Sequence, residues 1–249
     1  MLNQTKMFLY RMIKSKSFYV VLILHFIWSL LTIYVASRSW GFSEKQTSVS
    51  FSGLLYAYGG VGTYGMLMAM FATISTCADF TSGYIKNIAG RTRMRWHFIG
   101  AKTLAVFCYT IVSFAFFCIS TEFWCLVYDV KATWDSNTEL YALTIYVSSL
   151  CAALMGILIG ELFRRMGSSI ALTIILGNGL FSSLLTAFTS IAMDFQIGKY
   201  MPVGALLSMK EPTSTGFEGS AEWVIGVSLV YMVIFFGLSA FDFSRRDAV

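Results

Sequence analysis

The side chains of this sequence that could do chemistry are few, and their spacing fits none of the common catalytic motifs. The two histidines, His25 and His97, have no H-E-x-x-H neighbourhood of the kind that binds zinc in hydrolases. Neither the G-x-S-x-G motif of serine hydrolases nor the G-x-x-x-x-G-K-[ST] loop of nucleotide-binding proteins occurs. We therefore expect no catalytic residue here, and an ATP-driven activity would need a second chain.

The cysteines give no metal or redox site either. Their number is odd and no pair has C-x-x-C spacing, so neither a zinc site nor a disulfide framework is indicated. All five lie within or at the ends of apolar runs: Cys77, Cys108, Cys118, Cys125 and Cys151. A buried cysteine behaves as a small apolar residue. We expect no metal and no cofactor in this chain.

One polar and basic stretch, residues 77–102 (CADFTSGYIKNIAGRTRMRWHFIGAK), could recognise a soluble partner. Asp79 or Thr81 could cap a short helix, because hydroxyl and acidic side chains suit a helix N-terminus. The helix would have a small apolar face made by Tyr84, Ile85, Ile88 and Ala89. Gly90 would end it. The alternative is an ordinary positively charged loop whose arginines bind lipid.

The elements that must position this stretch are membrane helices. The chain is 57% hydrophobic and 12% charged, far more apolar than a soluble domain. Lipid admits only helices or closed barrels, and the apolar runs lack the alternation of barrel strands. We predict a single all-α membrane domain over residues 1–249, with six runs of about 20 residues or more. These are Phe18–Ala36, Leu54–Thr76, Phe98–Val127, Tyr141–Leu162, Ser168–Ala192 and Trp223–Phe241.

The positive charges predict the orientation of these spans. Of the 18 Lys and Arg residues, all but five fall on one side; the five are Arg38, Lys45, Lys131, Lys199 and Lys210. The positive-inside rule places the richer side, with both termini, in the cytoplasm. The first run is longer than a signal-peptide core, so we expect it to remain as a span.

Residues 1–17 have the pattern of a helix lying on the inner leaflet. At 100° per residue, one arc is apolar and the other is polar. The apolar arc holds Leu2, Phe8, Leu9, Met12 and Ile13. The alternative is a disordered basic tail.

Two stripes with a four-residue period could build contacts between helices. The first is a ridge of small residues that permits close helix packing: Ser148, Ala152, Gly156 and Gly160. The second is a polar band in the fifth span: Asn178, Ser182, Thr186 and Ser190. Polar groups in a span face protein or a cavity. The second band could therefore line a transport pathway or could only pack against neighbouring helices.

The stretch 77–102 resembles the permease subunits of type-2 ABC exporters, especially the short bacterial permeases of bacteriocin-immunity and peptide-toxin export systems. The matching residues are Asp79, Gly83, Lys86-Asn87-Ile88, Gly90, Arg91, Arg93 and Lys102. Lys199-Tyr200-Met201-Pro202 resembles the Pro-containing outer segment of the same family. The six-span layout and the basic N-terminal helix agree along the whole chain.

This resemblance implies that a coupling helix between spans two and three docks on a separate ABC ATPase subunit, which would bind ATP and Mg²⁺. The coupling residues would be Asp79, Gly83, Tyr84, Lys86, Asn87, Ile88, Arg91 and Arg93. A second permease copy or a homologue would complete the assembly in a bacterial plasma membrane. Residues 193–221 would form short outer helices, with the roles of Asp194, Lys199 and Pro202 left open.

The function that we expect is export of a hydrophobic or amphipathic substrate, such as a peptide toxin or antimicrobial. A non-transporting membrane scaffold or sensor that docks a cytoplasmic partner is the alternative. An ion-coupled carrier would need a carboxylate within the membrane, whereas Glu122 and Glu161 lie near span ends. Besides membrane lipid and protein, no nucleic-acid partner is expected.

Overall fold

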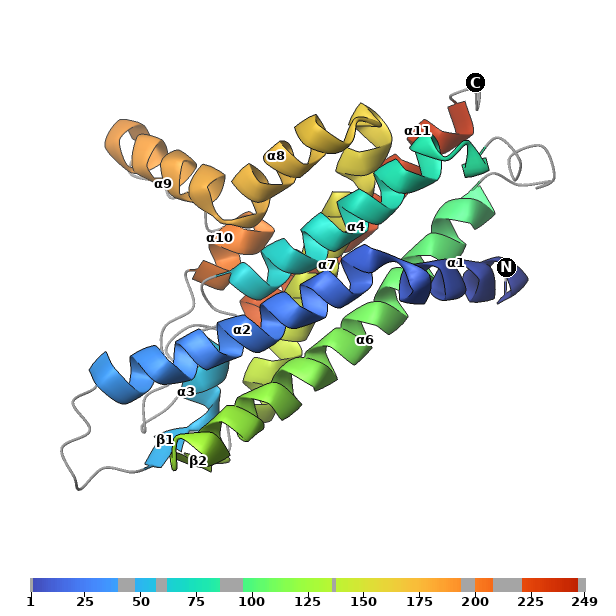
Figure 1. Cartoon of the computed structure of the whole chain (residues 1–249). Coiled ribbons are helices and arrows are strands. Elements are labelled where there is room, and N and C mark those ends of the chain that lie inside the picture. Colours follow the sequence, from blue (N-terminus) through green and yellow to red (C-terminus); the bar gives the residue numbers. More distant parts are fainter. Residues whose placement is uncertain are drawn as a thin grey trace.

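The computed structural model describes residues 2–39, 48–56, 62–85, 96–135, 138–193, 200–207 and 221–245, and they are almost entirely helical (Figure 1). The longer helices are α1 (Leu2–Lys14), α2 (Lys16–Ser39), α4 (Thr63–Thr81), α6 (Trp96–Val127), α7 (Thr138–Phe163), α8 (Met166–Gly177), α9 (Leu180–Met193) and α11 (Ala221–Arg245). Two short helices, α3 (Phe51–Leu55) and α10 (Pro202–Leu207), and two strands, β1 (Ser48–Ser50) and β2 (Lys131–Thr133), complete the fold. The prediction of a helical protein is confirmed.

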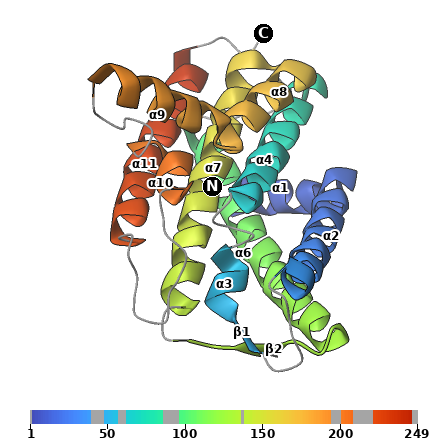
Figure 2. The same cartoon turned by 90° about the vertical axis from the view of Figure 1, so that its left-hand side faces the viewer.

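The bundle is organised around α7. In the most apolar stretch of α7, 72% of the residues are buried, against 17% in α11. Figure 2 shows α7 between α4 and α11, and α2 packs farther out against α6 and α4. The near-continuous apolar sequence of α7 therefore reflects contact with protein on most of its faces.

Within the described residues, four helices are long and apolar enough to cross a membrane: residues 16–35 of α2, and the whole of α6, α7 and α11. The pair α8–α9, bent by 51° at its break, could act as a fifth, either as a broken span or as a re-entrant loop. Large apolar side chains such as Phe188 and Val233 are 71% and 73% exposed. Apolar surface of this kind is suited to contact with lipid rather than water. The coarse prediction of several helices able to cross a membrane is confirmed.

Two of the six predicted spans differ from a single continuous helix. In the run Leu54–Thr76, α3 ends at Leu55 and α4 begins after Gly62, whose φ of +77° favours glycine. By itself α4 is not among the four spanning helices. The run Ser168–Ala192 breaks between α8 and α9, where Gly179 has a φ of +74°. The structure thus establishes four to five helices able to span a membrane, and six spans stay a prediction.

One end of the bundle gathers α1, the C-terminal end of α11, and the ends of α4 and α6 that flank residues 86–95 (Figure 1). Phe98 of α6 stacks on Phe243 of α11, with 4.8 Å between the ring centroids, and meets Phe8 of α1 edge-on. At the other end β1 and β2 form a parallel pair in which Ser48 lies opposite Lys131. The sequence analysis did not predict these strands.

The N-terminal helix forms over a shorter range than the predicted residues 1–17. Ser15 separates α1 from α2, because its hydroxyl accepts a hydrogen bond from the Phe18 amide at 3.3 Å and so caps α2. Phe8 and Met12 of the apolar arc are buried against the bundle, whereas the prediction placed this arc on the inner leaflet. Ile13 differs, since it is 50% exposed. Over its described residues this segment is a docked helix and not a tail.

Candidate functional site

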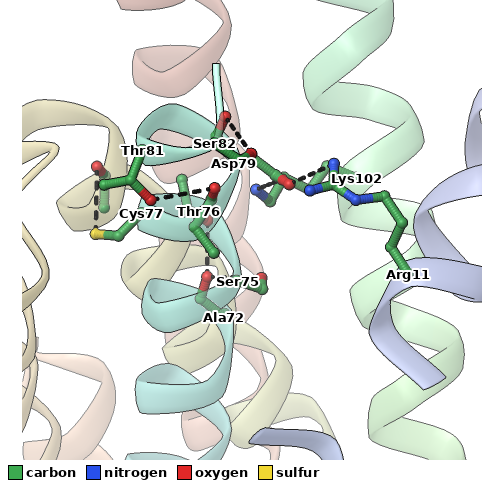
Figure 3. A network of polar contacts seen from close by, with 11 residues as sticks. Arg11, Ala72, Ser75, Thr76, Cys77, Asp79, Thr81, Ser82 and Lys102 are labelled. Carbon is green, nitrogen blue, oxygen red and sulfur yellow. Dashed lines mark hydrogen bonds and ion pairs between the residues drawn. The ribbon is translucent and has the colours of Figure 1, made fainter. Parts of the chain in front are cut away.

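Asp79 forms a cluster of ion pairs (Figure 3). The cluster lies at the end of the bundle that holds α1 and the C-terminal end of α11. Oδ1 of Asp79 lies 2.8 Å from Nη1 of Arg11 on α1, and its Oδ2 accepts a hydrogen bond from Nζ of Lys102 on α6 at 2.6 Å. Asp79 and Lys102 are 6% and 2% exposed, whereas the Arg11 side chain is 33% exposed. One carboxylate on α4 therefore ties three helices together.

Aromatic rings enclose this ion cluster. The Arg11 guanidinium lies 3.7 Å from the centroid of the Tyr84 ring, and Tyr84 in turn meets Phe8 edge-on at 6.1 Å. Such cation–π contacts become stronger when the cation is removed from water. Burial raises the pKa of the Tyr84 phenol, and the neighbouring Arg11 offsets part of that rise. The start of the predicted coupling segment is thereby packed onto α1.

Three of the eight predicted coupling residues lie within the described part of the chain. We expected that Asp79 could cap a following helix. Instead α4 continues to Thr81, and the Asp79 carboxylate is bound to two cations. Gly83 follows the end of α4 with a φ of +67°, and apart from its chain neighbours no described residue has an atom within 4 Å of the position that a Cβ would take. Tyr84 packs on α1 as described above. The other five lie outside the described residues: Lys86, Asn87, Ile88, Arg91 and Arg93.

A small cavity of about 90 Å³ opens beside the ion cluster, between α1, α4 and α6. Asp79 and Lys102 line one part of it, and Ser15, Ser17 and Ser75 contribute hydroxyl groups. A cavity of this size with polar groups on part of its wall can hold a few water molecules. The cluster is thus close to a place where water could reach it.

The small-residue ridge of α7 lies directly on α4. A Cβ built on Gly156 would overlap the carbonyl oxygen of Ala69, and one built on Gly160 would lie 2.7 Å from Cβ of Thr76. Ala152 faces Gly65 of α4, and Ser148 is 3% exposed. Close backbone approach is therefore possible only because these α7 positions lack large side chains.

A threonine joins the same two helices to α8. The Thr73 hydroxyl lies 2.9 Å from the Ala69 carbonyl oxygen, 3.0 Å from that of Gly156 and 2.9 Å from the Thr173 hydroxyl. All of these contacts are buried, where an unpaired hydroxyl would be costly. The α4–α7 contact is consequently fixed by hydrogen bonds as well as by shape.

The four residues of the predicted polar band are not on one continuous helix. Asn178 is exposed in the break between α8 and α9, Ser182 is buried, Thr186 is half-buried and Ser190 is exposed. The three hydroxyls donate to carbonyl oxygens within their own helix or at its start, at 2.8 to 3.0 Å. The structure records no hydrogen bond from them to another long helix among the described residues.

Of these four residues, Ser182 lines a second cavity. This cavity has a volume of about 330 Å³ and lies between α7, α8, α9, α10 and α11. Its walls are almost wholly apolar, with Met155, Phe181 and Phe235 among them, and Ala152 of the α7 ridge also contributes. The size is at the lower end of the range for small-molecule sites. An apolar ligand is the kind that these walls could hold.

Lys102 was among the residues that carry the exporter resemblance, but its ion pair with Asp79 and the contribution of Arg11 were not predicted. A cation four residues into the third span, after an acidic residue at the end of the second, was the available signal. Within the described ranges, no three His, Cys, Asp or Glu side chains come together in a way that could hold a metal ion.

The fold and this cluster define a class: a helical protein whose described residues include four to five helices long and apolar enough to cross a membrane, with α1, α4 and α6 joined at one end by the ion pairs on Asp79. The chain belongs to the family described as Protein of unknown function (DUF2705), which matches residues 61–249. The matched range begins just before α4 and runs to the C-terminus, so it contains Asp79 and Lys102 but not Arg11. No curated protein matches the chain.

Proposed function

We propose that this chain is the transmembrane subunit of an ATP-driven exporter, resembling the type-2 ABC permeases, and that a separate ATPase subunit powers it. The observation that carries the proposal is the Asp79 cluster at the base of segment 83–95. A partner that pushes on this segment would act on the ends of α4 and α6, which the cluster fastens to α1. Motion at the docking segment would thereby reach three helices at once.

The substrate that we propose is hydrophobic or amphipathic, in particular a peptide. Support comes from the apolar cavity of about 330 Å³ beside α9 and α10, and from the break between α8 and α9 next to it. Six spans would result if α3 and α4 formed one broken span and α8 and α9 another. Both termini would then lie in the cytoplasm of a bacterial cell, on the side that binds the ATPase.

Affinity purification from native membranes tests the proposal. The chain should bring with it a subunit that contains a P-loop and hydrolyses ATP, in a fixed ratio, and the gene for that subunit should lie close to its own. Reversal of charge by Lys86→Glu should reduce the amount recovered, whereas Lys131→Glu at the strand end should not. A stable, monodisperse chain that never brings an ATPase would favour a scaffold or sensor instead.

A further inference from the structure

Glu161 is a carboxylate buried inside the helix bundle. It lies near the C-terminal end of α7 and is 2% exposed. Among the described residues, neither of its carboxylate oxygens has a hydrogen-bond partner. The Ser239 hydroxyl of α11, itself 1% exposed, faces the carboxyl without reaching standard hydrogen-bond geometry. A carboxylate in these surroundings needs a proton or a cation to neutralise its charge.

Two cationic side chains lie near Glu161, and among the described residues neither forms an ion pair with it. Lys102 of α6 influences the carboxyl electrostatically, but its Nζ donates to Asp79 at 2.6 Å. Arg164, which follows α7, holds its guanidinium 4.8 Å from the centroid of the Phe80 ring on α4. Asp242 of α11 adds a negative charge that disfavours a second anion nearby.

Apart from Asp79 on α4, the described residues of α4 and α8 carry no charged side chain. On α4, the Cys77 thiol contacts the Gly160 carbonyl oxygen at 3.9 Å, one residue before Glu161. The helix that follows in the chain, α8, carries no ionisable side chain over Met166–Gly177. Among the described residues, the charges that act on Glu161 are therefore those of Lys102, Arg164 and Asp242.

An ionised carboxylate is costly in such a place, because burial removes its water and no hydrogen bond replaces it. A proton removes the charge and turns one oxygen into a donor. A metal ion fits poorly, since hard cations such as Ca²⁺ take six or more oxygens and here one carboxylate and one hydroxyl face each other. Two cationic side chains nearby also oppose a further cation.

We propose that Glu161 is a proton-binding site, occupied while α6, α7 and α11 are packed as in this structure. Release of the proton then requires water or a freed cation to enter between α7 and α11. Protonation of Glu161 and the packing of α11 on α7 are thus linked equilibria. This proposal does not depend on the proposed transport function.

Infrared spectroscopy of the purified chain tests the site directly. At neutral pH the wild type should show the carbonyl band of a protonated carboxylic acid in an apolar environment. Glu161→Gln should lose this band, while Asp242→Asn should keep it. Absence of the band from wild type, or its persistence in Glu161→Gln, would overturn the assignment.

The melting temperature measured as a function of pH gives a second test, because the proposal predicts the direction of its change. The folded chain keeps a proton that unfolded glutamate releases above a pH of about 4.3, so stability should fall as the pH rises above that value. Glu161→Gln should flatten this slope and raise the melting temperature at alkaline pH. Replacing potassium by sodium at constant ionic strength should leave both proteins unchanged. A sodium-dependent shift seen only in wild type would show that the ligand is a cation instead.

Carbodiimide labelling covers the case in which Glu161→Gln does not fold. A hydrophobic carbodiimide reacts with a protonated carboxyl in apolar surroundings, and mass spectrometry locates the modified residue. In wild type the label should be found on Glu161 at neutral pH and should decrease as the pH rises. Labelling of other carboxyls without Glu161 would contradict the proposal.

Discussion

Asp79 holds α1, α4 and α6 together at one end of the bundle, because Arg11 of α1 and Lys102 of α6 both pair with its carboxylate. Lys102 is almost completely buried and has no other anion within hydrogen-bond distance among the described residues. Removing the charge of Asp79 would therefore strand an ammonium group inside the protein. Arg11 would lose less, since a third of its side chain reaches solvent.

We expect Asp79→Asn to lower the free energy of unfolding by about 3–5 kcal/mol, the usual loss when one partner of a buried ion pair is removed. Lys102→Met in the same chain should recover most of this loss, because it removes the stranded charge. Arg11→Ala should cost about 1 kcal/mol or less. Thermal unfolding in detergent measures all three, and equal losses for Arg11→Ala and Asp79→Asn would contradict this ranking.

A second carboxylate, Asp135, links α3 to the start of α7. It accepts hydrogen bonds from the hydroxyls of Ser52, at 2.6 Å, and of Thr138. Burial alone would raise the pKa of the Asp135 carboxyl, but these hydrogen bonds outweigh burial and hold the pKa below its usual value.

Because the folded pKa of Asp135 is the lower one, its stabilisation is present above the unfolded pKa of about 3.9 and is lost as the pH falls through the folded pKa. We expect the wild type to lose melting temperature in acid more steeply than Asp135→Asn, which lacks this titration. Parallel curves for the two proteins between neutral and strongly acidic pH would show that Asp135 contributes nothing.

At the scale of elements, the contact between α4 and α7 depends on the absence of side chains. Gly156 lies against the backbone of Ala69, so a methyl group there can be accommodated only by moving a helix. Gly226 on α11 offers a matched comparison, since nothing lies within 4 Å of its Cβ position. Both glycines are within helices, so the change in helix propensity is the same.

We expect Gly156→Ala to destabilise the protein by about 1–3 kcal/mol, because overpacking of a tight interface outweighs the gain in helix propensity. Gly226→Ala should instead be stabilising by up to about 1 kcal/mol, the propensity difference alone. Chemical denaturation of both variants decides the matter. A stabilised Gly156→Ala would mean that α4 and α7 are not in such close contact.

The sequence predicted the elements whose signal is a long apolar run. The bounds of α2, α6, α7 and α11 agree with four of the predicted spans to within a few residues. The breaks at Gly62 and Gly179 were missed, because a glycine within an apolar run fits both a packed helix and a turn with positive φ. The strands β1 and β2 have three residues each, which is too short for an alternating pattern to be recognised in the sequence.

The candidate site was predictable only in part, because the sequence does not show which side chains of different helices come into contact. Asp79 was singled out from its place in segment 77–102, but its partners Arg11 and Lys102 lie on other helices. Glu161 was interpreted as a residue at a helix end, whereas α4 and α11 lie against that end in the fold. The position of a residue near the end of an apolar run does not show which neighbouring helix buries its side chain.

For the whole molecule, the arrangement of α1, α11 and the α4–α6 junction at one end gives a test of topology. A membrane-impermeant thiol reagent should label cysteines placed at Ser136 or Thr215 in intact cells, in a background without the five native cysteines. Cysteines at Ser15 or Thr92 should react only after the cells are opened. Labelling of the Thr92 position from outside would invert the proposed orientation.

Stimulation of ATP hydrolysis tests the central claim, a permease driven by a partner ATPase, most directly. The ATPase that co-purifies with the chain would be measured in lipid vesicles without the chain, with the wild type, and with Lys86→Glu or Lys131→Glu at equal incorporation. We expect that the wild type and Lys131→Glu change the rate of hydrolysis and that Lys86→Glu does not. A hydrolysis rate that is the same with and without the wild-type chain would contradict the central claim.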